Sequence, residues 1–107
     1  MNTLSFSGKD LMPPPELRAL LSYQTFRIVA GQHEQAFSVV SVSQHSVGVF
    51  LVELAQNDGI RWHGILVTQE EIGPTTMVLQ SDEPKGRNDW NRLIHHAKLI
   101  SQGSPNH

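Results

Sequence analysis

From Ser46 to Thr68 the chain reads SVGVFLVELAQNDGIRWHGILVT, two apolar runs separated by a polar turn. The runs are rich in Val, Ile, Phe and Trp, which suit a pleated, half-buried surface, and the turn contains Asn, Asp and Gly. Because this turn is too short for a parallel crossover, the runs predict adjacent antiparallel strands over residues 46–54 and 60–68.

Three further runs of similar composition lie on either side of this pair, at residues 24–30, 36–43 and 75–80. All connections between neighbouring runs are short, which excludes parallel pairing of consecutive strands. The sequence therefore predicts a curved, five-stranded antiparallel β-meander.

The turn QNDGI between the two central runs leaves two registers open. A three-residue hairpin loop with Gly59 in the left-handed conformation places Glu53 opposite His63. A two-residue turn at Asp58 and Gly59 shifts the register by one and places Glu53 opposite Gly64. We favour the first register, which brings together the two ionisable residues that lie well inside these strands.

A short helix is predicted before the meander, over residues 16–22. Three prolines at residues 13–15 precede it, and Pro15 suits the first helical position. Its leucines fall at helical spacing on one face, so the helix is expected to pack on the sheet. These leucines are Leu17, Leu20 and Leu21.

A longer helix is predicted after the meander, over residues 89–101. Asn88 or Asp89 can accept hydrogen bonds from its first free backbone amides. Its apolar side chains gather on one face at about 100° per residue, and Trp90 is the expected anchor on the sheet. The apolar face consists of Trp90, Leu93, Ile94, Ala97 and Ile100.

The length of 107 residues and the order of elements predict a single α+β domain, with residues 1–12 and 102–107 flexible or loosely attached. The first dozen residues lack the apolar core and the positively charged start of a signal peptide. No apolar stretch approaches the roughly 20 residues that span a bilayer. We therefore expect a cytoplasmic protein with no membrane association.

The composition argues against several classes of function. Eight Lys and Arg against ten Asp and Glu give a net charge of −2, which does not favour nucleic acid as a partner. The chain has no cysteine, and its six histidines show no recognised metal-ligand spacing. We predict no metal and no cofactor, and with no familiar catalytic motif present an enzymatic activity is uncertain and not favoured.

Glu53 and His63 are the candidate catalytic residues. A carboxylate beside an imidazole orients one ring nitrogen and leaves the other free to act as a base. The alternative is a cross-strand polar pair on a solvated face, with no catalytic role. Trp62, Arg61 and Phe50 are the candidate binding residues beside this pair.

The central strands carry apolar residues on both faces, more than two short helices would cover. We therefore predict a small binding or interaction module that forms a homodimer through an apolar sheet face. The same surface could take a protein partner or a small apolar ligand. The alternative function is a small metal-independent enzyme, or a ligand-binding cavity protein, that uses Glu53 and His63.

Overall fold

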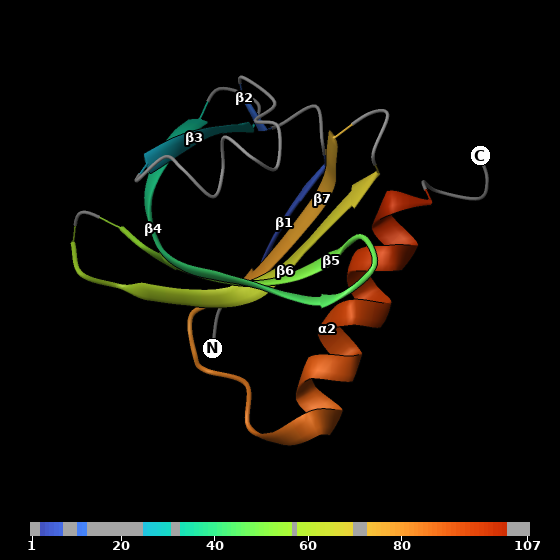
Figure 1. Cartoon of the computed structure of the whole chain (residues 1–107). Helices are drawn as coiled ribbons and strands as arrows, with labels where there is room; N and C mark the ends of the chain where they lie inside the picture. The colour runs from blue at the N-terminus through green and yellow to red at the C-terminus, as the bar shows by residue number, and fades with distance from the viewer. Residues whose placement is uncertain are drawn as a thin grey trace.

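The computed structural model of the chain describes residues 3–7, 11–12, 25–30, 33–56, 58–69 and 73–102 (Figure 1). Over these residues the fold is α+β: an antiparallel sheet with a C-terminal helix packed on it. The helix predicted over residues 16–22 lies outside the described residues. The elements are β1 Thr3–Ser7, β2 Leu11–Met12, β3 Thr25–Ala30, β4 His33–Ser46, β5 Val49–Ala55, β6 Arg61–Gln69, β7 Gly73–Gln80 and α2 Gly86–Ser101.

The strands form one sheet in the order β1-β7-β6-β5-β4-β3-β2. The run from β3 to β7 is the predicted meander, so all five predicted strands are confirmed, in sequence order and antiparallel. The sheet has two more strands, β1 and β2, in a segment where the sequence predicted none. β1 pairs with β7 and buries Phe6, which is 5% exposed.

The β5–β6 hairpin has the three-residue loop that the sequence favoured. The Gln56 amide donates to the Ile60 carbonyl at 3.0 Å, and Gly59 has φ +90°, the left-handed region that suits glycine. The Ile60 amide donates to Asp58 Oδ1 at 3.1 Å, which holds the turn. Glu53 is therefore paired with His63, as predicted.

β4 is the longest strand and the one along which the sheet changes direction. Its first part, 33–38, pairs with β3, and its second part, 38–46, pairs with β5. Register shifts occur between Val39 and Ser41 and between Gln44 and Ser46. Bulges of this kind bend a strand and increase its twist, so β3 and β2 turn over one face of the sheet (Figure 1).

The sheet consequently buries apolar side chains on both faces. The curled face encloses a core that spans from β1 to β4, and α2 covers the opposite face of β6, β7 and β1 (Figure 1). The core of the curled face contains Phe6, Phe37, Phe50, Val52, Leu54, Trp62, Leu66, Met77 and Leu79. The core under α2 contains Val49, Ile65, Val67, Val78, Leu93 and Ala97.

α2 begins three residues earlier than predicted, at Gly86, and its apolar face is confirmed. Neither Asn88 nor Asp89 is the N-cap: Lys85 holds that position, and Asp89, inside the first turn, accepts the Lys85 backbone amide at 2.9 Å. The expected anchor needs correction. Trp90 is only partly buried, whereas Leu93 is 3% and Ala97 0% exposed, because these two side chains sit over the middle of the sheet.

Leu93 and Leu99 offer a matched test of how α2 is held. Leu93→Ala removes a buried side chain from the core under α2 and should lower the free energy of unfolding by about 2–5 kcal/mol. Leu99→Ala removes the same group from a side chain that is 50% exposed and should cost about 0.5 kcal/mol or less. Urea unfolding followed by circular dichroism measures both, and equal losses would contradict this packing.

Gly64 permits the close approach of β6 and β7. A Cβ atom at this position would overlap the Val78 carbonyl oxygen and lie 2.8 Å from Leu79 Cα. Both are backbone groups that can move only with the strand. Gly64→Ala should therefore destabilise the protein by about 3 kcal/mol, whereas Ser43→Ala, at an exposed strand position, should change stability by about 0.5 kcal/mol or less. Urea midpoints that agree within error would refute the assigned contact.

Candidate functional site

A row of polar residues crosses the α2-covered face of the sheet at one end. The pairing registers place Glu53 beside His63 and His63 beside Gln80, and Ser41 and Thr3 continue the row on the outer strands. Neighbouring side chains in such a row have Cβ atoms about 4.5–5.5 Å apart. We call Glu53, His63 and Gln80, the three central members, the polar row.

The polar row lies just beyond the part of the sheet that α2 seals. The next row on the same face contains Leu51, Ile65 and Val78, which pack in the core under the helix. The connection from β7 passes below the end of the sheet before α2 starts (Figure 1). As a result Glu53 and His63 keep side-chain exposures of 28% and 17% in the middle of a sheet.

Glu53 is held between two basic side chains that project from β6. Arg61 Nη1 donates to Glu53 Oε2 at 2.7 Å, and His63 Nε2 lies 3.7 Å from Glu53 Oε1. Each carboxylate oxygen therefore has a separate partner, which restricts rotation of the Glu53 side chain. Because Arg61 is 55% exposed, the ion pair contributes at most about 1 kcal/mol to stability, and its main effect is orientation.

His63 is the more constrained member of the pair. Its Nδ1 atom is buried and has no hydrogen-bond partner among the described residues. A general base must come within hydrogen-bond distance of the proton that it takes, and Nδ1 is shielded from solvent here. The geometry therefore favours a binding role for Glu53 and His63 over proton transfer by the second ring nitrogen.

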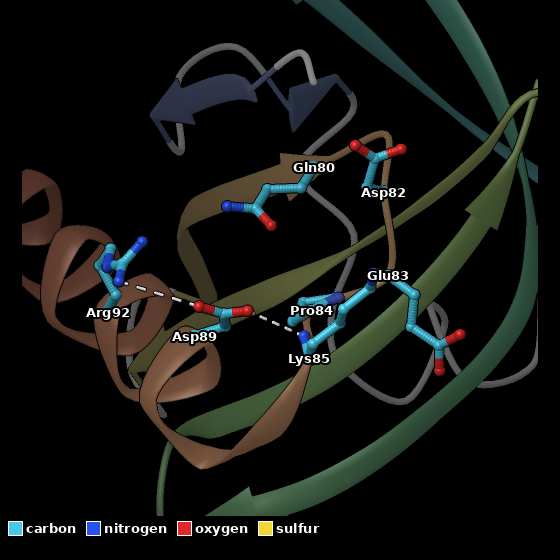
Figure 2. A pocket seen from close by; sticks show the side chains of 7 residues that line it. All are labelled: Gln80, Asp82, Glu83, Pro84, Lys85, Asp89 and Arg92. Carbon is cyan, nitrogen blue, oxygen red and sulfur yellow. Dashed lines mark hydrogen bonds and ion pairs between the residues drawn. The ribbon is translucent and has the colours of Figure 1, made fainter.

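A hollow of about 500 Å³ adjoins the polar row at Gln80. In Figure 2 the Gln80 amide extends from the end of β7 toward an ion pair on α2, in which Arg92 Nη2 lies 3.8 Å from Asp89 Oδ1. The lining carries three carboxylates and two cationic groups, so it is slightly acidic. The lining residues are Gln80, Asp82, Glu83, Pro84, Lys85, Asp89 and Arg92.

The structure separates the five residues that the sequence nominated. Glu53, His63 and Arg61 lie together on the α2 side, whereas Trp62 and Phe50 lie on the opposite face, 5% and 7% exposed in the core. Trp62 Nε1 donates to Gln56 Oε1 at 3.0 Å, which satisfies its polar atom within the protein. A binding role for Trp62 or Phe50 stays a prediction.

Sequence reasoning did not find Gln80 or the hollow. Gln80 ends an alternating run in which Thr76 and Val78 share its face, so its side could be read from the pattern. The position of Gln80 beside His63 could not be read from the pattern, because it depends on the β6–β7 register, which contains a shift after Val67.

The other ionisable residues form no comparable cluster in the described part of the chain. His95 and His96 are exposed on α2, and His96 Nε2 lies 3.3 Å from Ser5 Oγ. Among the described residues no group of three or more His, Asp or Glu could hold a metal ion. No helix in the described ranges is both long enough and apolar enough to cross a membrane.

Comparison with known proteins assigns no family: no family model, no curated protein and no solved structure matches the chain. The class of protein is therefore defined by the structure alone, as an α+β protein with a curled antiparallel sheet and one covering C-terminal helix. Function has to be argued from the polar row and the hollow.

His63→Leu tests whether His63 is there for stability. Leucine fills a similar volume and removes the buried Nδ1, which has no partner in the described ranges and whose burial then costs about 1–3 kcal/mol. We expect the free energy of unfolding to rise by about 1 kcal/mol, measured by urea denaturation, with the exposed His95→Ala as the control. A loss of more than about 1 kcal/mol would instead identify His63 as a structural residue.

Proposed function

We propose that the protein is a small binding module whose ligand site consists of the polar row and the adjoining hollow. The observation that carries this proposal is the position of Glu53, His63 and Gln80 on adjacent strands, at the edge of the helix-covered face, beside a hollow of about 500 Å³. That volume is within the range of small-molecule sites, roughly 300–1,000 Å³.

The charges of the site favour a small ligand that carries an amine. Glu53 is oriented by Arg61, so its carboxylate can accept further hydrogen bonds without a loss of side-chain freedom on binding. In the hollow the carboxylates outnumber the cationic groups, and neither Asp82 nor Glu83 has an ion-pair partner among the described residues. Gln80 supplies both a donor and an acceptor to a neutral polar group.

The ligand site is better supported than a dimer through an apolar sheet face. In the described residues the large apolar side chains that are exposed are scattered: Val47 at a hairpin tip, Ile60 in a turn, Val40 on β4 and Leu99 on α2. The apolar residues of β5 and β6 are buried within the monomer, except Leu51 and Ala55, which are partly buried. A homodimer through that surface stays a prediction, as does an enzymatic use of Glu53 and His63.

The proposed site can be tested by titrating the ¹⁵N-labelled protein with small probes. Putrescine and ethanolamine should shift the amide resonances of residues 53, 63 and 80 with dissociation constants in the micromolar to millimolar range, whereas citrate and inorganic phosphate should not. Glu53→Gln and Gln80→Ala should each weaken amine binding about tenfold.

The control for Gln80→Ala is Gln102→Ala, which removes the same side chain from an exposed position at the end of α2. It should bind the amines as the wild type does. The proposal is wrong if no probe at about 10 mM shifts the three amides, or if binding survives both site variants. Tighter binding of the anions would contradict the proposed ligand chemistry.

A further inference from the structure

We infer that the free edge of β4 is a second interaction surface, and that it pairs in antiparallel fashion with the same edge of a second copy of the chain. The inference is independent of the ligand site. It begins with Ser38, which pairs with Thr25 of β3 on one side and with Ala55 of β5 on the other. β3 therefore lies along the edge of β4 that is opposite β5.

Beyond Ser38 that edge has no partner strand among the described elements. β3 begins at Thr25, opposite Ser38, and pairs with residues 33–38, while residues 39–46 pair with β5 alone among the described strands. The burial pattern agrees, because residues 40, 41 and 43–46 are exposed. An edge of this kind presents unpaired backbone amides and carbonyls, which form a template for a further strand.

The segment 39–46 reads VVSVSQHS, and of the usual protections of an open edge it has bulges, at its two register shifts, but no protective residue type. It contains no Lys, Arg, Asp, Glu or Pro, the residues that natural proteins place there to prevent pairing. Its two register shifts leave residues 41–44 regularly paired with β5 between them. β1, the outer strand at one end of the sheet, offers a less suitable edge than β4. It is only five residues long, and its Ser5 side chain contacts α2.

A second copy is the occupant that this edge fits best. Antiparallel pairing of one segment with itself has two-fold symmetry, which is the commonest symmetry of protein oligomers. Like charges opposite one another would destabilise such a pair, and residues 39–46 have no side chain with a permanent charge. Val40, 45% exposed, lies in the same segment and would be shielded by the partner strand.

The pairing should be weak. A stable interface buries more than about 1,000 Å², and a few paired residues at one strand edge bury less. We therefore expect a dimer that forms at high micromolar concentration, with its two-fold axis near Ser43. The dimer joins two sheets edge to edge and leaves the apolar faces within each protomer.

The decisive experiment introduces opposite charges at Ser43, an exposed residue near the middle of the edge. Ser43→Lys and Ser43→Glu should each weaken dimerisation of the full chain at least tenfold, because the two copies then oppose like charges. An equimolar mixture of the two variants should recover the dimer, a result that misfolding cannot produce. Sedimentation equilibrium at low salt, up to about 1 mM protein, measures all three.

Asn91→Lys is the matched control, since it adds the same charge at an exposed position on α2 and should dimerise as the wild type does. Hydrogen exchange of the amides in residues 39–46 should slow as wild-type concentration rises. A wild type that stays monomeric overturns the proposal and leaves the edge to an extended peptide of another protein. A dimer that Ser43→Lys does not weaken, or a mixture that does not recover, overturns it equally.

Discussion

The need to bury apolar side chains on both faces of the central strands governs this structure. On β5 and β6, residues such as Val52 and Trp62 lie on one face while Ile65 and Val67 lie on the other, and all of them are buried. A single helix can cover only one face. The second face is buried because the sheet curls, which requires the bend in β4 and the bare backbone at Gly64.

The position of the candidate site follows from how far α2 reaches. The helix seals the rows of the sheet that contain Val78 and Thr76, and the next row toward the end of the strands holds polar residues in place of apolar ones. His63 shows what this boundary position costs, since one of its ring nitrogens is buried and has no hydrogen-bond partner in the part of the chain that the structure describes. A residue that is unfavourable where it lies is more readily explained by binding than by packing.

Local signals were sufficient for part of the fold and of the site. The turn QNDGI fixes the β5–β6 register within a few residues, so the contact of Glu53 with His63 could be predicted from the sequence. The period of two along a strand also placed Trp62 on the face opposite His63, which argues against grouping the two in one site. β1 pairs with β7 from the other end of the chain, and the place of Gln80 beside His63 depends on a register shift between β6 and β7 that the sequence does not signal.

The bend that closes the interior lies where the free edge of β4 begins. β4 pairs with β3 as far as Ser38, and its first register shift against β5 follows at once, between Val39 and Ser41. Beyond Ser38 no described strand lies on the side of β4 that faces away from β5. The curl that buries one face within the monomer and the proposed pairing edge therefore meet at the same irregularity in β4.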